Sequence, residues 1–183
     1  RKYITLPERE PDAVWGICDV KNSGTDYMFL PAVAQYGDDY YCIDCICDDN
    51  ADFGLQETRC ADLIIRTKMQ QCQFESNNGG DRFAANVAAK VAEGKGACNI
   101  TTKFTEANKS TKIIVNADWV KKHVLFPDKC LYEPKSDLDK MMTFLLTYTV
   151  VGNQKKKTDD VPDGWAQFAL FVNGGILRNR VEV

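Results

Sequence analysis

The chain has 183 residues, 44% of them apolar, and a net charge of −3, which allows one domain with a substantial core that no low-complexity tract or Gly/Ser linker divides. The charge gives no electrostatic reason to expect nucleic acid as a partner, because phosphate binding needs a concentrated basic surface. No apolar run approaches the roughly 18 residues that a membrane span needs, so we expect a single soluble domain over residues 1–183.

Alternation of apolar and polar residues predicts β-strands along much of the chain. The clearest case is 61–69, where alternate residues would share one face of a half-buried strand. Similar β-rich runs separated by Asn, Gly, Asp and Lys predict further strands over 40–47, 99–104, 112–115, 120–126 and 142–151. Antiparallel β-structure should therefore dominate.

The segment 83–92 is compatible with two structures. Phe83, Val87 and Val91 fit one face of a helix and, being evenly spaced, one face of a strand equally well. We favour the strand.

The end of the chain changes period and predicts one helix over about 162–173. Trp165, Phe168, Ala169 and Val172 recur at helical spacing, with a proline ahead of them and two glycines behind. Seven or eight strands followed by one helix indicate an up-and-down β-barrel over about 13–151 with the helix packed outside it, since closure removes exposed strand edges.

The cysteines predict disulfide bonds and an extracellular location. Their even number and irregular spacing are typical of oxidised, exported proteins, and each bridge is worth roughly 2 to 4 kcal/mol. Zinc binding by the Cys-x-x-Cys-x-Cys segment is the less favoured alternative, because it needs a reducing compartment. The residues expected to form disulfides are Cys18, Cys42, Cys45, Cys47, Cys60, Cys72, Cys98 and Cys130.

Two N-glycosylation motifs also favour export. Asn99 and Asn108 each begin an Asn-x-Ser/Thr sequence, which predicts a solvent-facing stretch between Cys98 and Ile113. The charged and prolyl residues at the beginning of the chain suggest that any signal peptide has been removed.

Four stretches together resemble the lipocalin family. Ala13-Val14-Trp15 resembles the Gly-x-Trp of the first lipocalin strand, with Trp15 closing the barrel floor. Residues 118–126 resemble the family's aspartate-aromatic segment, 141–148 its last barrel strand, and 161–176 its C-terminal helix. Ala13 replaces the family's glycine, and the arginine usual near the end of the last strand is absent.

The resemblance implies a secreted carrier that sequesters a small hydrophobic or amphipathic molecule, such as a pigment, lipid, retinoid or amine, and that is not an enzyme. No metal or other cofactor is expected, and the partners would be this ligand or an extracellular assembly, including a homo-oligomer. The residues expected to line the barrel cavity and bind the ligand are Leu63, Ile65, Met69, Phe83, Val87, Phe144, Leu146 and Tyr148.

A second interpretation is a netrin-like or metalloproteinase-inhibitor module. Cys45-Ile46-Cys47 followed by Cys60 and an alternating segment is similar to the opening of such domains. These inhibitors use a free amino-terminal cysteine, whereas 44 residues precede Cys45 here.

Catalytic motifs are difficult to find. The single histidine, His123, lies beside two lysines and has no recognisable partners for a triad or a metal hydrolase. The acidic pairs at 38–39, 48–49 and 159–160 are typical of solvated turns rather than of a glycosidase pair, and the basic run at 155–157 is typical of a solvated turn as well.

Overall fold

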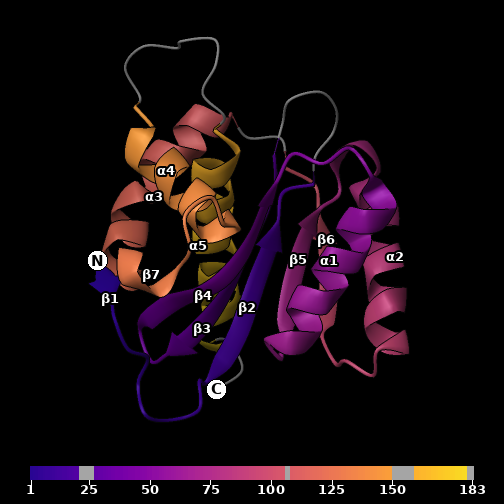
Figure 1. Cartoon of the computed structure of the whole chain (residues 1–183), viewed down its shortest axis with the longest axis horizontal. Helices are drawn as coiled ribbons and strands as arrows, with labels where there is room; N and C mark the ends of the chain where they lie inside the picture. Colours follow the sequence, from indigo (N-terminus) through magenta and orange to yellow (C-terminus); the bar gives the residue numbers. More distant parts are fainter. Residues whose placement is uncertain (21–26, 106–107, 150–158, 181–183) are drawn as a thin grey trace.

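The computed structural model describes residues 1–20, 27–105, 108–149 and 159–180. A seven-stranded sheet lies between helices on both of its faces (Figure 1), and its strand order is β1-β7-β4-β3-β2-β5-β6. The strands are β1 (Lys2–Tyr3), β2 (Ala13–Cys18), β3 (Met28–Tyr36), β4 (Asp39–Asp48), β5 (Gln71–Glu75), β6 (Asn99–Lys103) and β7 (Val124–Pro127). The helices are α1 (Phe53–Arg66), α2 (Gly80–Glu93), α3 (Lys109–His123), α4 (Asp137–Thr147) and α5 (Asp160–Arg180), with short 3-10 turns at Asn77–Gly79 and Lys129–Leu131.

The centre of the sheet is the antiparallel hairpin of β3 and β4. The turn between them contains Gly37 at φ 64°, a left-handed conformation that glycine adopts without strain. Both faces of β3 are covered, because Met28 and Leu30 pack with α1 and α2 while Phe29 and Val33 pack with α4 and α5. A strand buried on both faces carries a nearly continuous apolar run, and this explains the composition of β3.

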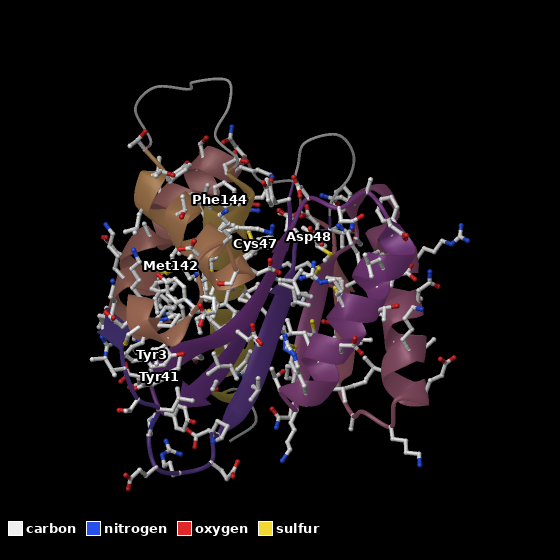
Figure 2. The ribbon with its side chains drawn as sticks, in the orientation of Figure 1. Tyr3, Tyr41, Cys47, Asp48, Met142 and Phe144 are labelled. Atoms are coloured by element: carbon white, nitrogen blue, oxygen red, sulfur yellow. The ribbon has the colours of Figure 1, made fainter. Side chains whose placement is uncertain are left out.

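Parallel strands extend the sheet on both sides of the hairpin. β5 runs parallel to β2, with Cys18 opposite Phe74, and β6 runs parallel to β5. On the other side β7 runs parallel to β4 and β1 runs parallel to β7. Tyr3 and Tyr41 meet edge to face at this end, with ring centroids 5.3 Å apart (Figure 2). Because β2 and β5 are parallel neighbours, their carboxyl ends lie side by side.

The prediction of an antiparallel lipocalin-like barrel over 13–151 is wrong. The sheet is open and mostly parallel, and parallel neighbours need crossover connections, which the helices supply. The strand predicted at 61–69 falls largely in α1, where Asp52 caps the first turn by accepting from the Leu55 amide at 3.0 Å. Cys60, Leu63 and Ile64 form its buried face at helical spacing.

Three further strand predictions are also wrong. Residues 83–92 lie in α2, whose buried face includes Phe83, Val87 and Val91. The predicted strand 112–115 lies inside α3, and 142–147 of the predicted strand 142–151 lies inside α4. The runs at 40–47 and 99–104 do contain strands, β4 and β6, and the run at 120–126 ends in β7.

The predicted disulfide scaffold is absent, since all eight cysteines are free thiols. Six of them are buried, and burial raises the pKa of thiols such as Cys18, Cys45 and Cys72 well above its usual range. Such thiols behave as small apolar core residues. The extracellular location inferred from disulfides loses its basis.

Ion pairs, rather than disulfide bonds, link elements that are distant in the sequence. Arg59 of α1 pairs with Asp48 at the end of β4 and, at 2.6 Å, with Asp137 at the start of α4. Figure 2 places Asp48 beside Cys47 at this end of the sheet. Arg59 thus joins helices from opposite faces around one strand end. Within the described residues, no helix is long and apolar enough to cross a membrane.

Candidate active site

Two acidic residues lie at the carboxyl ends of neighbouring parallel strands. Asp19 directly follows β2, and its backbone continues the ladder to Phe29 with hydrogen bonds of 3.0 and 3.2 Å. Glu75 is the last residue of β5. Because β2 and β5 pair in parallel with Cys18 opposite Phe74, the two carboxyl groups project from the same edge of the sheet.

The first turn of α5 brings further carboxylates to this edge. Asp160 is 6% exposed and Asp163 is fully buried. Acidic side chains are favoured here because the amino end of a helix carries partial positive charge. One turn later, Gln167 Nε2 donates to Asp163 Oδ2 at 2.9 Å and to Glu75 Oε2 at 3.4 Å. Gln167 therefore links the strand carboxylate to the helix carboxylate.

Glu75 is also held by the turn that follows it. Its other oxygen, Oε1, accepts from Asn77 Nδ2, and the Asn77 amide also donates to the Thr105 carbonyl at 3.0 Å. α2 begins against the Glu75 backbone, where a Cβ on Gly80 would lie 1.8 Å from the Glu75 carbonyl oxygen. Glycine is required at this close approach, and it lets α2 fix the position of Glu75.

Two lysines from the first turn of α3 enter the acidic cluster. Lys109 Nζ lies 3.0 Å from Asp160, 3.6 Å from Asp159 and 3.8 Å from Asp19. Lys112 Nζ lies 2.9 Å from Asp163 Oδ1, and both of these side chains are buried. Asp160 Oδ2 additionally accepts from the Tyr27 amide at 3.0 Å. We call Asp19, Glu75, Asp159, Asp160 and Asp163 the acidic cluster.

Burial raises the pKa of Asp19 well above its usual range; Lys109 opposes this shift, and the negative charges of Glu75, Asp160 and Asp163 add to it. Burial acts to lower the pKa of Lys109, but its carboxylate neighbours, Asp19 and Asp160 foremost, outweigh burial and raise it. Asp19 Oδ2 is buried without a hydrogen-bond partner among the described residues. A buried acceptor without a hydrogen bond lowers the stability of the fold.

The donor set suits a hard divalent cation. Its members are carboxylate oxygens, the ligands that Mg²⁺ and Mn²⁺ prefer. The buried Asp19 Oδ2 receives no hydrogen bond, and a bound cation would satisfy it instead. As the described side chains lie, no three Asp, Glu, His or Cys groups converge closely enough to hold a metal ion. Lys109 contacts three of the carboxylates and Gln167 contacts two, so loading requires their rearrangement.

Two hollows adjoin the cluster. One, of about 230 Å³, includes Lys112 and Gln167 together with Lys103 and Phe104. The other, of about 340 Å³, includes Val20 next to Asp19 and extends to Arg82 of α2. Each hollow is lined by one exposed cation, Lys103 in the first and Arg82 in the second.

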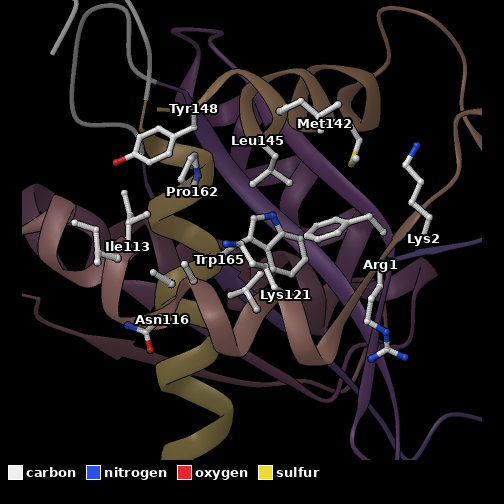
Figure 3. A pocket seen from close by; sticks show the side chains of 16 residues that line it. Arg1, Lys2, Ile113, Asn116, Lys121, Met142, Leu145, Tyr148, Pro162 and Trp165 are labelled. Carbon is white, nitrogen blue, oxygen red and sulfur yellow. The ribbon is translucent and has the colours of Figure 1, made fainter. Parts of the chain in front are cut away.

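A larger hollow of about 480 Å³ lies apart from the acidic cluster, between α3, α4 and α5. Figure 3 shows the Trp165 indole at its centre, with Leu145 and Met142 on one side and Ile113 on the other. Its lining is mainly apolar and includes none of the acidic cluster. The chemistry of the molecule is therefore concentrated at the ends of β2 and β5.

Comparison with solved structures identifies similar folds. The nuclease domain of human cytomegalovirus terminase, manganese-soaked and inhibitor-bound, has a TM-score of 0.65 at 10% identity, covering 94% of this chain and 89% of that one. The large terminase nuclease of thermophilic phage G20c with bound zinc has a TM-score of 0.57 at 16% identity, covering 90% of both chains. The large terminase of another thermophilic bacteriophage has a TM-score of 0.59 at 14% identity, covering 92% of this chain.

The chain spans 42% of the length of this last protein. No protein-family model matches the chain, and no curated protein matches it in sequence. At these identities the likeness establishes the fold, which is the ribonuclease H-like α/β fold of terminase nucleases.

This fold overturns the functional predictions made from sequence. A secreted lipocalin carrier, a protein without enzymatic activity, a hydrophobic ligand or pigment as the sole bound group, and an extracellular setting without nucleic acid are all contradicted by the match to terminase nucleases. The net charge averages over the whole surface, so it does not exclude a local group of cations.

The residues predicted to line a barrel are divided between the two faces of the sheet. On one face Leu63, Met69, Phe83 and Val87 are buried in the core with α1 and α2, and Ile65 packs against that core. On the other, Phe144 packs against Tyr27, while Leu146 and Tyr148 line the large apolar hollow. The structure does not bring the eight residues together.

The remaining predicted residues lie away from the acidic cluster. Trp15 is in β2, where its indole donates to Gln35 at 2.8 Å, and without a barrel it closes no floor. His123 ends α3 and stacks on Trp119 at 4.8 Å. Asn99 begins β6 and Asn108 caps α3, and their glycosylation stays a prediction. The basic run at 155–157 lies outside the described residues.

Sequence reasoning missed the whole acidic cluster. The pair 159–160 was interpreted as a solvated turn, yet Asp160 is buried. The available signal was an acidic residue at the end of each of two short strands, Asp19 after the apolar run 13–18 and Glu75 after 71–74, in which apolar and polar residues alternate. That signal has meaning only when the strands are known to be parallel neighbours.

Proposed function

We propose that this chain is a divalent-metal-dependent nuclease domain that cleaves DNA. The observation that carries the proposal is the meeting of Asp19 and Glu75, from adjacent parallel strands, with Asp160 and Asp163 from the start of α5. Carboxylates from three separate elements share one partly buried edge, in the fold of terminase nucleases. We also propose that residues 1–183 form one domain.

The acidic cluster supplies the ligands in this proposal. Asp19, Glu75 and Asp160 or Asp163 would hold the cation, which when bound would polarise a phosphodiester and lower the pKa of a water molecule. The named neighbours support the nuclease reaction and the class of metal in this proposal, since one is a nuclease soaked with manganese and another a nuclease with bound zinc.

The chain's own residues prepare the site before substrate arrives. Asn77 and Gln167 fix both oxygens of Glu75, and the Tyr27 amide fixes one oxygen of Asp160. Lys112 neutralises the buried carboxylate of Asp163. Once Lys109 and Gln167 have moved to admit the cation, groups held by the other contacts need little further reorganisation during a reaction.

The test is cleavage of supercoiled plasmid DNA by the purified protein with Mn²⁺ or Mg²⁺, with and without EDTA. We expect metal-dependent nicking or linearisation that EDTA abolishes. Asp19→Asn and Glu75→Gln should each slow cleavage by about 100-fold or more, since removing even groups that only support a ligand typically costs about 10- to 100-fold.

The matched control is Asp62→Asn, which makes the same chemical change at an exposed position of α1. It should leave cleavage unchanged. Activity that persists in EDTA, or that survives both Asp19→Asn and Glu75→Gln, would contradict the proposal.

A further inference from the structure

Lys109 is a cation at the amino end of a helix, where an anion is preferred. It is the first residue of α3, and Lys112 follows within the same turn, where α3 has no acidic residue. The amino end of a helix favours anions, so two lysines there are locally unfavourable. Their partners are carboxylates from other elements. A local rule broken in this way points to a role in the site.

The two lysines differ in their access to solvent. The Lys112 side chain is 3% exposed and holds one carboxylate, whereas the Lys109 side chain is 42% exposed and lies within 4 Å of Asp19, Asp159 and Asp160. Lys112 is thus a fixed part of the core. Lys109 is partly exposed and has a long flexible side chain, so its ammonium can move from the cluster into solvent.

The Lys109 ammonium lies among the carboxylates that we propose as metal ligands. Its ammonium bridges Asp160 at 3.0 Å and Asp19 at 3.8 Å, yet Asp19 Oδ2 still lacks a hydrogen bond. The ammonium therefore supplies positive charge to Asp19 without satisfying it. As the described side chains lie, no three acidic groups converge closely enough to hold a metal ion, so loading requires the carboxylates around Lys109 to move.

We propose that Lys109 is an internal counter-ion of the metal-free site, and that a divalent cation displaces its ammonium from Asp19 and Asp160 towards solvent. The inference rests on the proposed metal site but not on DNA cleavage. Lys109 balances the carboxylates while the site is empty and competes with the metal, so it sets the concentration at which the site loads. It acts through the carboxylates and is a positioning residue.

The first experiment measures Ca²⁺ and Mn²⁺ binding by isothermal titration calorimetry without nucleic acid. Lys109→Met should bind each ion about 10- to 100-fold more tightly than the unaltered chain, because a competing charge a few ångströms from the ion is gone. Lys109→Arg, which keeps the charge, should stay close to the unaltered chain.

Lys140→Met is the matched control. Lys140 has a similar exposure of 37% and pairs at 3.2 Å with Asp137, which is not a member of the acidic cluster. Its replacement should leave both affinities unchanged. If Lys109→Met binds no more tightly than Lys140→Met, the inference is overturned.

The second experiment uses the unaltered chain and does not depend on a variant folding. Reductive methylation of lysines, quantified by peptide mass spectrometry, should proceed several-fold faster at Lys109 once Ca²⁺ is added, while Lys140 keeps its rate. An unchanged rate at Lys109, in a chain that calorimetry shows to bind Ca²⁺, would mean that the ammonium stays in place. Ca²⁺ binding with Lys109 release but no DNA cleavage would leave this inference standing and contradict the proposed function.

Discussion

Asp19 is the residue at which stability and function are most clearly in conflict. Its carboxyl is buried and lacks a hydrogen bond at Oδ2, and burial raises its pKa well above its usual range. A carboxyl whose pKa is higher in the folded state contributes its stability below the unfolded-state pKa, near 4, and loses it as the pH rises through the folded-state pKa. At neutral pH without metal, Asp19 therefore weakens the fold.

Asp19→Asn should raise the free energy of unfolding at pH 7 to 8 in EDTA by about 0.5–2 kcal/mol, a range common for substitutions that relieve such conflicts. The gain should shrink as the pH falls from the raised folded-state pKa towards 4, because the native carboxyl is protonated over this range. Urea denaturation across this pH range measures it. Asp62→Asn, at an exposed position, should change stability by no more than about 0.5 kcal/mol. A gain that is independent of pH would show that the charge of Asp19 is not its cause.

The pair of Lys112 and Asp163 should behave as a buried ion pair. The two side chains are 3% and 1% exposed and lie 2.9 Å apart. Lys112→Met leaves the Asp163 carboxylate buried and uncompensated, and should lower the free energy of unfolding by about 3–5 kcal/mol. The double variant Lys112→Met/Asp163→Leu should recover most of this loss, which a urea double-mutant cycle measures. Equal losses in the single and double variants would contradict pairing.

At the scale of elements, the sequence predicted strands and helices with unequal success. Apolar spacing at Trp165, Phe168, Ala169 and Val172 indicated a helix, and the structure has α5 there with these side chains buried. The same spacing in α2 was ambiguous, because residues four apart are also an even number apart. In α1, alternate apolar residues concealed the helical set of Gln56, Cys60, Leu63 and Ile64. Caps such as Asp52 would have decided the matter.

A glycine of α5, Gly164, allows this helix to pack closely against the sheet. A Cβ on Gly164 would lie 2.4 Å from Phe29 Cδ1, near the start of β3. Gly164→Ala should therefore lower the free energy of unfolding by about 1–2 kcal/mol, because overpacking outweighs the helix propensity that alanine gains. Thermal or urea unfolding measures the loss.

The matched variant lies in the same helix. Gly174 is exposed, and a Cβ there would meet nothing within 4 Å. Gly174→Ala should raise stability by about 0.5–1 kcal/mol. A destabilising Gly174→Ala, or a neutral Gly164→Ala, would mean that α5 does not sit against Phe29 as described.

At the scale of the whole molecule, the acidic cluster is a product of topology. Asp19 and Glu75 are 56 positions apart, and Asp160 follows 85 positions later. Sequence alone could suggest that each follows an apolar strand or begins a helix, but only the β2–β5 pairing and the docking of α5 bring them together. Long-range placement of this kind is not encoded in any local spacing, and for this reason the site was not predicted while parts of its supporting elements were.

Net charge averages over the whole molecule, so the surface near the cluster is the better basis for a prediction about DNA binding. Arg82 and Lys103 are exposed, and each lines a hollow that adjoins the acidic residues. If DNA crosses this edge, its phosphates would meet these cations on the way to the carboxylates. Each lost phosphate contact should weaken binding similarly for all sequences and reduce the slope of log affinity against log salt by about 1.

Arg82→Ala and Lys103→Ala should therefore each weaken binding of a short DNA duplex, and the double variant should reduce the salt slope by about 2. Fluorescence anisotropy between 50 and 200 mM salt, about the range where such contacts dominate, measures both quantities, with Ca²⁺ present to limit cleavage. Lys68→Ala, at an exposed position after α1, is the control and should leave the slope unchanged. An unchanged slope in the double variant would place the DNA elsewhere, because a phosphate contact cannot be removed without releasing fewer counterions.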